Sequence, residues 1–587
     1  MSQRCGGFVL YPEREREKDP EGKFGVRSFF LLIPFFLRLR VKPFVNRPDH
    51  IVNESETTGL NWTTDENAIP GKIDTSTLDG KYRDNAGQEI QLGPQQLKAA
   101  KAICDVLQKD IPAGAKERRQ HIFLLGGAGT GKSKVIEYVA KTLPVLMMAP
   151  TGIAASVIGA KTVHSTLDIR VGHDKDLTAD EVKTMQAGGL YTKINGVVLD
   201  EISFVSREIL RSIDKRLRQL MGEEHLRFGG LPVIFVGDFY QLPPPGGSRL
   251  YMPDSATIKG ADQRTVDTNI FDESYAFELF AQQRASGDLR HTQLVEKMRI
   301  NPAEAWKEFL EAVQFLTADD VTSQGFADAM VIVPANEERH IINMQMALAT
   351  ASKTGNKLLL WDSGYCEKSN MTIEEVIVSQ PWRLNAFQAG ARCIVNENMG
   401  TSKVANGAPA ILRSIIVDGE APTVLRTTMF PNVEHIRAPK FVICELVNAL
   451  NQPNGVQVPM TERNWASKDD KKNAGTMTYD LASAATYHKV QGQTLERVIL
   501  DVSTRPMLLG RLDFHSAYVA ITRVKSLDAI RVVPRIDRTD AAWKKWRRPE
   551  FPLMRHAIWL SESTYSFGES KIAMREPLKK KARLEKH

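Results

Sequence analysis

The chain has 587 residues, of which 42% are hydrophobic and 25% are charged, and its formal net charge is +7. That length predicts three or four domains, and the composition is that of a soluble globular protein, which excludes a wholly disordered chain. Residues 571–587 hold seven Lys or Arg and only two Glu, so they account for most of the net charge. A surface that binds a polyanion is therefore expected to be local.

Residues 1–84 are predicted to form a poorly defined N-terminal appendage. The apolar run Phe29–Leu37 is shorter than the roughly twenty residues that span a bilayer, and Pro34 interrupts it. Acidic side chains between Glu13 and Glu21 argue against a transit peptide, which is poor in acidic residues. The sequence therefore predicts no membrane as a partner.

The five cysteines are widely scattered, and none belongs to a C-x-x-C pair of the kind that binds zinc or exchanges electrons. We expect free thiols. Free thiols favour a reducing compartment such as the nucleus, the cytosol or the mitochondrial matrix.

The first strongly patterned segment is a predicted strand, loop and helix over residues 121–141. A short apolar run precedes the spacing G-x-x-x-x-G-K-[ST], and an amphipathic helix follows it. Glycines let backbone N–H groups turn toward phosphates, and the helix N-terminus adds partial positive charge. Lys132 would reach the β- and γ-phosphates, and the Ser133 hydroxyl would complete the shell of a Mg²⁺ ion. The predicted nucleotide-binding loop consists of Gly126, Gly127, Ala128, Gly129, Thr130, Gly131, Lys132 and Ser133.

A second apolar run, residues 195–199, ends in an acidic pair, Asp200 and Glu201. A hydrolase with a phosphate loop needs a carboxylate for its metal ion and a base that polarises the attacking water. We predict that Asp200 holds Mg²⁺ and that Glu201 is the general base. An Asp-Glu pair by itself is usually a solvated surface feature, but this pair follows a buried strand downstream of the phosphate loop.

Residues 231–236 predict a third strand, and the segment Gly237–Pro244 after it must be a loop because its prolines cannot continue a strand or helix. Gln241 could contact the γ-phosphate from this loop. From the residues alone, a simple turn is an equal alternative.

The second half of the chain predicts another parallel sheet, with strands at residues 331–334 and 498–501. Between them, residues 392–476 combine β-branched alternation with glycine turns, which predicts an inserted small β-barrel. The basic run at residues 579–583 could be a nuclear import signal, an anchor for nucleic acid or a solvated charge run.

In this order the segments resemble the Pif-type helicases of superfamily 1, the 5′-to-3′ branch that also contains RecD-like enzymes. The resemblance covers about residues 90–535, and it is nearest to divergent eukaryotic copies, including those in rolling-circle transposons. Leu92–Gln96 is similar to the adenine-reading motif of the family, so Gln96 joins the predicted nucleotide-binding residues. The other segments that carry the resemblance are Ala149–Ala155, Thr162–Ser165, Phe204–Met221, Gln283–Arg284, Gly390–Arg392, Val404–Ala408, Ala485–Thr494 and Tyr518–Val524.

The resemblance implies an α/β fold with two RecA-like motor domains, each a doubly wound parallel sheet, and an inserted small SH3-like β-barrel. Residues 168–190 occupy the stretch where the family has its strand-separating wedge. The predicted parts are the appendage 1–84, motor domain 1 with the wedge at 85–283, motor domain 2 at 284–391 and 477–537, the inserted β domain 392–476, and a basic C-terminal tail 538–587.

The resemblance also implies the activity: an ATP-dependent DNA helicase that moves 5′-to-3′ on single-stranded DNA and unwinds duplex, with ATP and Mg²⁺ as cofactors. Roles in DNA repair, recombination or telomere maintenance would follow, in the nucleus or alternatively the mitochondrion. The expected partners are single-stranded and forked duplex DNA, and the expected state is a monomer or a weakly self-associating chain.

Site roles follow from the same resemblance. Arg284 and Arg523 match the arginines that place positive charge on the γ-phosphate, so they join Lys132, Glu201 and Gln241 as predicted catalytic residues. Phe239 or Tyr240 could stack on bases, or either could be buried between the domains. The predicted contacts to DNA are Thr151, His164, Ser165, His488 and Lys489.

Two other readings stay open at this point. The chain could be an ATPase that acts on protein or RNA, or an inactive remnant that binds DNA as a scaffold. Decaying copies usually lose motif residues, and this sequence keeps the matched lysine, carboxylates, glutamine and arginines.

Overall fold

The computed structural model describes residues 73–109, 121–169, 175–250, 270–322, 325–396, 407–447, 453–461, 479–502, 512–533 and 556–558, with short gaps at 85–86, 188, 190, 192–193, 271–273, 286, 363–364, 417–424 and 440. The apolar run near the N-terminus, residues 170–174 of the predicted wedge and the basic run at residues 579–583 lie outside this part. Within it, no helix is both long enough and apolar enough to cross a membrane.

A seven-stranded parallel sheet organises the first part of the fold, here called the first lobe. Its strand order is β23-β8-β3-β7-β6-β4-β5. The central strands β3, β6 and β7 are covered on both faces, which is why they read as continuous apolar runs in the sequence. The strands are β3 (His121–Gly126), β4 (Val145–Ala149), β5 (Lys161–Thr162), β6 (Gly196–Leu199), β7 (Val233–Gly237), β8 (Ser274–Leu279) and β23 (His556–Ile558).

Helices and a hairpin surround this sheet. In the longest of these helices, α7, Leu210, Ile213 and Leu217 recur at helical spacing and are buried against the sheet. Ser206 caps the N-terminus of α7 by accepting from the Ile209 N–H at 3.2 Å, and Gly222 ends it in the left-handed conformation. The elements are β1 (Lys81–Arg83), β2 (Glu89–Gln91), α2 (Pro94–Leu107), α3 (Lys132–Thr142), α4 (Gly152–Val157), α5 (Val163–Thr166), α6 (Ala179–Ala187) and α7 (Arg207–Met221).

A second, five-stranded parallel sheet organises what we call the second lobe, in the order β20-β10-β21-β22-β9. Two separate parallel sheets with flanking helices confirm the predicted mixed α/β class. The strands are β9 (Gln314–Phe315), β10 (Met330–Val333), β20 (Ala484–Thr486), β21 (Val498–Leu500) and β22 (Ile530–Val532). The helices are α8 (Leu289–Ile300), α9 (Pro302–Ala312), α10 (Ala318–Thr322), α11 (Asn336–Thr354), α14 (Tyr487–Val490) and α15 (Phe514–Ile521).

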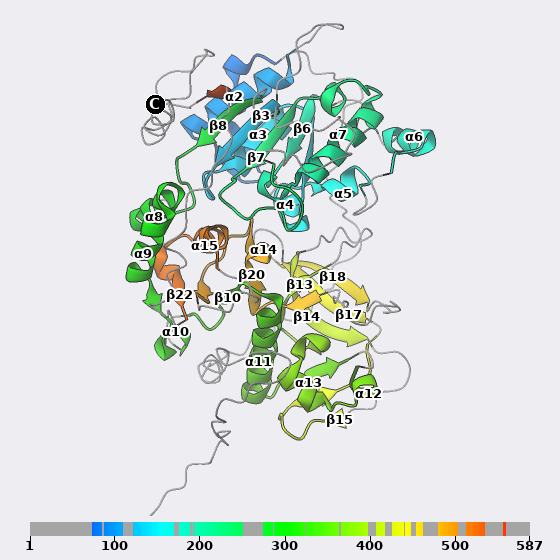
Figure 1. Cartoon of the computed structure of the whole chain (residues 1–587), viewed down its shortest axis with the longest axis vertical. Coiled ribbons are helices and arrows are strands. Elements are labelled where there is room, and N and C mark those ends of the chain that lie inside the picture. The colour runs from blue at the N-terminus through cyan, green and yellow to red at the C-terminus, as the bar shows by residue number, and fades with distance from the viewer. Residues whose placement is uncertain are drawn as a thin grey trace, which may run out of the picture.

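Two smaller sheets lie beside α11, on the side away from α8, α9 and β22 (Figure 1). One is antiparallel, in the order β18-β17-β14-β13-β19, and the other is mixed, in the order β12-β11-β16-β15. The antiparallel strands are β13 (Arg392–Val395), β14 (Pro409–Ile416), β17 (Phe441–Val447), β18 (Pro453–Thr461) and β19 (Tyr479–Leu481). The mixed sheet holds β11 (Leu358–Trp361), β12 (Asn385–Phe387), β15 (Leu425–Arg426) and β16 (Val433–His435), beside α12 (Tyr365–Ser369) and α13 (Ile373–Ser379).

These sheets bear on two predictions. The antiparallel sheet agrees with a β-rich insertion, whereas its closure into an SH3-like barrel stays a prediction. The domain boundaries also stay a prediction, although β11 and β12, which precede residue 392, share a sheet with β15 and β16, which follow it. No pattern in the sequence predicts β23, which lies within the predicted basic tail and pairs in parallel with β8.

The two lobes share a buried apolar cluster. Phe204, Tyr240 and Leu242 come from loops of the first lobe, yet they pack with Phe514 and Tyr518 of the second. Tyr240, which is 6% exposed, is buried in this shared cluster, as one of the two alternatives for the aromatic pair predicted, whereas Phe239, also 6% exposed, is buried in the core of the first lobe. Both are buried side chains rather than surfaces on which bases could stack.

Candidate active site at the interface of the two lobes

Three chemically important loops meet at one edge of the first-lobe sheet. The phosphate loop follows β3, the acidic pair follows β6, and Asp238 follows β7. These three strands are neighbours in the parallel order β3-β7-β6, so their carboxyl ends lie side by side. The carboxyl edge of an open parallel sheet is where such folds bind ligands.

The phosphate loop is closely packed against its surroundings. Gly129 and Gly131 adopt left-handed φ angles of 86° and 85°, which favour glycine. A Cβ at Gly131 would lie 2.1 Å from Nε2 of Gln96, so no other residue fits there without a shift. Gln96 itself donates from Nε2 to the Thr130 carbonyl at 3.0 Å and accepts from the Gly93 N–H at 2.9 Å. The predicted adenine-reading glutamine thus also supports the shape of the loop.

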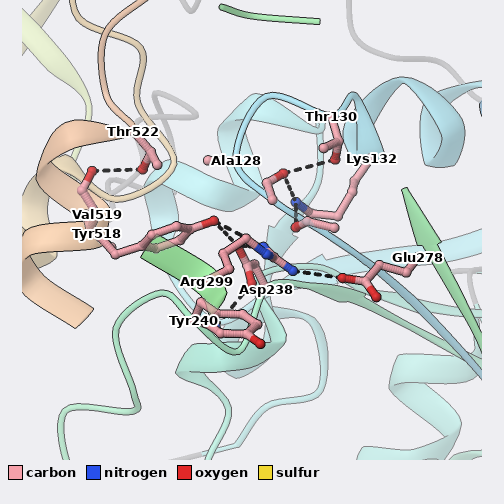
Figure 2. Close-up of polar contacts among 12 residues, drawn as sticks. Ala128, Thr130, Lys132, Asp238, Tyr240, Glu278, Arg299, Tyr518, Val519 and Thr522 are labelled. Atoms are coloured by element: carbon pink, nitrogen blue, oxygen red, sulfur yellow. Dashed lines mark hydrogen bonds and ion pairs between the residues drawn. The ribbon is translucent and has the colours of Figure 1, made fainter. Parts of the chain in front are cut away.

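Lys132 lies over this loop at the start of α3. Its Nζ donates to the carbonyls of Gly126 at 2.8 Å and Gly127 at 3.1 Å, as Figure 2 shows. Burial lowers the pKa of Lys132, while Asp238 and other nearby carboxylates oppose that shift. Ser133, the next residue, is exposed. A positively charged side chain and a hydroxyl therefore stand together at the mouth of the loop.

The two residues of the acidic pair, Asp200 and Glu201, have different surroundings. Asp200 is 7% exposed, and burial together with the neighbouring Glu201 raises its pKa to about 7. Glu201 has a left-handed φ of 50°, which is uncommon for a residue with a side chain and is typical of functional positions. Its Oε2 accepts from Nε2 of Gln491 at 3.1 Å, and the same amide nitrogen lies 3.2 Å from Oγ of Ser203. A second-lobe side chain therefore holds the predicted base.

Gln241 is buried beside this pair. It is 4% exposed, and among the described residues its Oε1 has no hydrogen-bond partner. The next residue, Leu242, donates its N–H to Oε1 of Gln491 at 3.2 Å. The loop after β7 is thus fixed to the second lobe, while one amide oxygen in it is left to interact with a ligand or water.

Arg523 is the most buried cation at the interface, at 1% exposure. Its guanidinium donates to the carbonyls of Val519 at 2.9 Å and Gln493 at 3.2 Å, and to Oγ1 of Thr522 at 2.8 Å. In the part of the chain that the structure describes, no carboxylate lies within ion-pair distance of it. Burial and the neighbouring Arg284 lower the pKa of Arg523 to about 9. A buried cation without a counter-charge favours an anionic ligand.

Arg284 connects Arg523 to the phosphate loop. Its N–H donates to the Gly129 carbonyl at 3.1 Å, and its Nη1 donates to the Thr522 carbonyl at 3.0 Å. The structure therefore brings the two predicted arginines together and places one of them directly on the loop that carries Lys132.

Sequence reasoning missed several residues at this interface. Gln491, Asp238 and Tyr518 each fall within a matched segment, and their chain positions gave no sign that they meet. Arg299 lies in no matched segment, yet its guanidinium is 2.9 Å from Asp238 and 2.9 Å from Glu278. Its local sequence resembles that of any helix end with a basic residue, so only the spatial arrangement could reveal it.

The predicted DNA contacts occupy the carboxyl edges of both sheets. Thr151 follows β4 and caps α4, accepting from the Ala154 N–H at 3.2 Å. His164 is half-buried in α5, after β5, and burial lowers its pKa, whereas Ser165 is exposed. His488 is exposed in α14, after β20, and its ring lies 6.2 Å from that of Phe204.

Lys489 is held differently from the other predicted contacts. Its Nζ pairs with Asp480 at 2.7 Å and donates to Oδ1 of Asn396 at 2.9 Å. Asp480 also pairs with Arg339, and burial of this carboxylate is offset by the two cations, which keep its pKa low. In this arrangement Lys489 joins α14 to β19 of the antiparallel sheet, and its charge is already compensated.

Comparison with known proteins gives the chain a family context. The family model described as "PIF1-like helicase" matches residues 97–261. The ATP-dependent DNA helicase PIF1 of Saccharomyces cerevisiae is 28% identical over 553 residues, a match that covers 78% of this chain and 62% of that protein. The ATP-dependent DNA helicase Pif1 of Bdellovibrio bacteriovorus is 26% identical over 468 residues, which covers 76% of this chain and 88% of that protein.

Solved structures agree on the fold. The Pif1 helicase from Candida albicans superposes with a TM-score of 0.51 at 19% identity, over 76% of this chain and 95% of that one. Bacteroides Pif1 bound to ssDNA gives a TM-score of 0.50 at 19% identity, over 76% of this chain and 93% of that one. At such identities the likeness concerns the arrangement of sheets and helices alone.

Proposed function

We propose that this chain, which is similar to PIF1-like helicases, hydrolyses ATP to move along DNA and separate its strands. One observation carries most weight: Arg523 is a buried cation with no ion-pair partner among the described residues, and Arg284 joins it to the phosphate loop. A triphosphate bound at that loop would supply the missing negative charge from between the lobes.

The chain's own groups would divide the chemistry among them. Lys132 and the loop N–H groups would bind the phosphates, and Arg284 and Arg523 would stabilise the charge that develops on the γ-phosphate during transfer. Glu201, held by Gln491, would accept a proton from the attacking water. The free amide oxygen of Gln241 would orient that water or contact the γ-phosphate.

Asp200 and Ser133 fit the expected Mg²⁺ ion. Burial raises the pKa of Asp200, so a nearby cation would favour its charged form. The described residues contain no group of three or more His, Cys, Asp or Glu side chains that could hold a metal. In proteins, Mg²⁺ takes most of its ligands from water and substrate phosphates. Bound Mg²⁺ would neutralise charge on the β- and γ-phosphates.

Movement would follow from the same interface. Release of the γ-phosphate after hydrolysis would take away part of the negative charge that joins the lobes, so the lobes would open and close once per ATP while Thr151, His164, Ser165 and His488 hold one strand. Lys489, which is already paired with Asp480, would reach that strand only by exchanging this partner. Through the family resemblance, the proposal also includes several finer points. These are the 5′-to-3′ direction, a wedge near residues 168–190, the SH3-like insertion, the domain boundaries and a monomeric state. The proposal includes, on the same ground, forked DNA as substrate, a role in repair, recombination or telomere maintenance, and a nuclear or mitochondrial location.

A strand-displacement assay on duplexes with a 5′ or a 3′ single-stranded overhang tests activity and direction together. We expect ATP-dependent unwinding of the 5′-tailed substrate and ATP turnover that rises when single-stranded DNA is added. Unwinding only from the 3′ tail would overturn the direction. Turnover that responds to RNA and not to DNA would support an ATPase of another class, and no turnover at all would support an inactive scaffold.

The substitution Glu201→Gln isolates the proposed base. Glutamine keeps the size and the contact with Gln491 but cannot take a proton, so kcat for ATP hydrolysis should fall by about 10²- to 10⁴-fold. ATP affinity, measured with a fluorescent analogue, should stay within about twofold, because the triphosphate is bound by other groups. Glu223→Gln, an exposed change in the same lobe, is the control. Hydrolysis by Glu201→Gln at the parent rate would exclude Glu201 as the base.

A further inference from the structure

Arg299, near the end of α8, makes more polar contacts across the interface than its sequence suggests. Nη1 pairs with Oδ2 of Asp238 at 2.9 Å, and Nη2 pairs with Oε1 of Glu278 at 2.9 Å. The guanidinium also stacks over the ring of Tyr240, 4.3 Å from its centroid. Figure 2 shows Arg299 reaching between these side chains. A residue of the second lobe is thus bound to the loop after β7 and to strand β8 itself.

A tyrosine hydroxyl closes this arrangement into a triangle. The Tyr518 hydroxyl donates to Oδ2 of Asp238 at 2.9 Å, and Nη1 of Arg299 donates to the same hydroxyl at 3.1 Å. The side chains of Arg299 and Asp238 are 15% and 1% exposed. Charge-assisted hydrogen bonds at such burial are stronger than exposed ones, and each member of the triangle fixes the other two.

The triangle touches the phosphate loop. A Cβ at Gly127 would lie 3.3 Å from Nη1 of Arg299 and 3.4 Å from the Tyr518 hydroxyl. The carbonyl of the same Gly127 accepts from Nζ of Lys132 at 3.1 Å. The polar groups that join the lobes therefore lie next to the backbone that would bind the phosphates, with little room between them for a side chain at Gly127.

The triangle also fixes the segment that carries the buried arginine. Tyr518 is in α15, and Arg523 follows that helix and donates from Nε to the Val519 carbonyl. Any rotation of α15 that moved the Tyr518 hydroxyl away from Asp238 would move Arg523 as well. The position of the guanidinium relative to the phosphate loop is thus coupled to the three hydrogen bonds of the triangle.

We propose that Arg299 is a positioning residue for ATP hydrolysis: with Asp238 and Tyr518 it holds α15 so that Arg523 faces the phosphate loop. The inference deepens the proposed function and rests on it. Arg299 does not contact the reacting atoms. It acts through Tyr518 and Asp238, and its planar fork is required because one side chain must reach Asp238, Glu278 and the Tyr518 hydroxyl together.

Three variants test this role: Arg299→Lys, Tyr518→Phe and the two combined. Lysine keeps the charge but not the fork, and phenylalanine removes only the hydroxyl. We expect kcat for DNA-stimulated ATP hydrolysis to fall by about 10- to 100-fold in each single variant, as a small misplacement of a catalytic group does, with KM for ATP nearly unchanged. The double variant should lose little more than the worse single variant, because the groups act as a unit. Arg290→Lys makes the same substitution at an exposed position of α8 and should match the parent.

A second readout does not depend on turnover. The affinities for ADP and for ADP with fluoroaluminate, which mimics the phosphoryl group during transfer, should respond differently to the substitution. Arg299→Lys should weaken the affinity for ADP with fluoroaluminate by about tenfold and the affinity for ADP by less than twofold. A lower Tm with an unchanged affinity ratio and unchanged kcat would show a purely structural ion pair and overturn the inference. If the parent hydrolysed ATP with no response to DNA and Arg299→Lys still shifted the affinity ratio, the proposed motor function would be contradicted and the positioning role would stand.

Discussion

We expect Arg523→Ala to lower kcat for ATP hydrolysis by about 10³- to 10⁵-fold, the range found when a guanidinium is removed from a phosphoryl-transfer site. The structure supplies the reason. Arg523 is buried with only carbonyl and hydroxyl partners among the described residues, and Arg284 stands beside it, so its charge is available to an anion in the interface. Because charge on the γ-phosphate grows only as its bond breaks, KM for ATP should change much less than kcat.

Steady-state ATP hydrolysis with saturating single-stranded DNA measures this effect. Arg497→Ala is the matched control, since it removes an exposed guanidinium from the same lobe. Arg523→Lys should recover only a small part of the loss, because an ammonium cannot reproduce the fork that three acceptors hold. An Arg523→Ala protein that folds with the parent Tm and hydrolyses ATP within tenfold of the parent rate would contradict the placement of Arg523 at the γ-phosphate.

We expect Lys132→Ala to reduce ATP hydrolysis to the background of the assay and to leave the fold intact. The ammonium is held by the carbonyls of Gly126 and Gly127, at the centre of the loop, where it would meet the β- and γ-phosphates. Loss of a single preorganised donor from an electrostatic site already costs about 10²- to 10³-fold, and here the lost donor also carries the charge that binds the triphosphate. ATP affinity should therefore fall together with kcat.

Lys134→Ala is the control for this prediction, because it removes an exposed lysine from the same helix two residues later. The Tm of Lys132→Ala should stay close to that of the parent, since burial already disfavours the lysine charge in the folded protein. Hydrolysis at the parent rate by Lys132→Ala, with Lys134→Ala equally active, would show that the nucleotide binds elsewhere.

The parts of the fold that sequence reasoning anticipated are those in which chemistry and secondary structure are contiguous. The run from His121 to Ser133 contains a buried strand, a glycine turn and a helix start, and each step constrains the next over a few residues. The same holds for residues 196–201, where an apolar strand ends in two carboxylates. Both segments occupy the carboxyl edge of one parallel sheet, as expected for strands with apolar side chains on both faces.

The strand pairing of the mixed sheet could not be predicted from local patterns in the sequence. It pairs β11 with β16 in parallel and with β12 in antiparallel fashion, so strands separated by tens of residues lie side by side. Strands of three or four residues have too short a pattern of side chains to predict which strand they pair with. Strand β23, far along the chain from β8, is a further instance of pairing that no local pattern encodes.

Short segments of the sequence are enough to predict which residues would bind and cleave a triphosphate, because glycine spacing, a lysine and a pair of carboxylates are local properties. The folded arrangement reveals which distant side chains hold these residues in place. It joins Gln491 to Glu201, Arg284 to Thr522, and Arg299 to Asp238 and Tyr518, and it commits Lys489 to Asp480. The reason is physical: these contacts depend on the order of strands in the sheets and on the packing of one lobe against the other, which arise from burial of the whole chain rather than from any local run of residues.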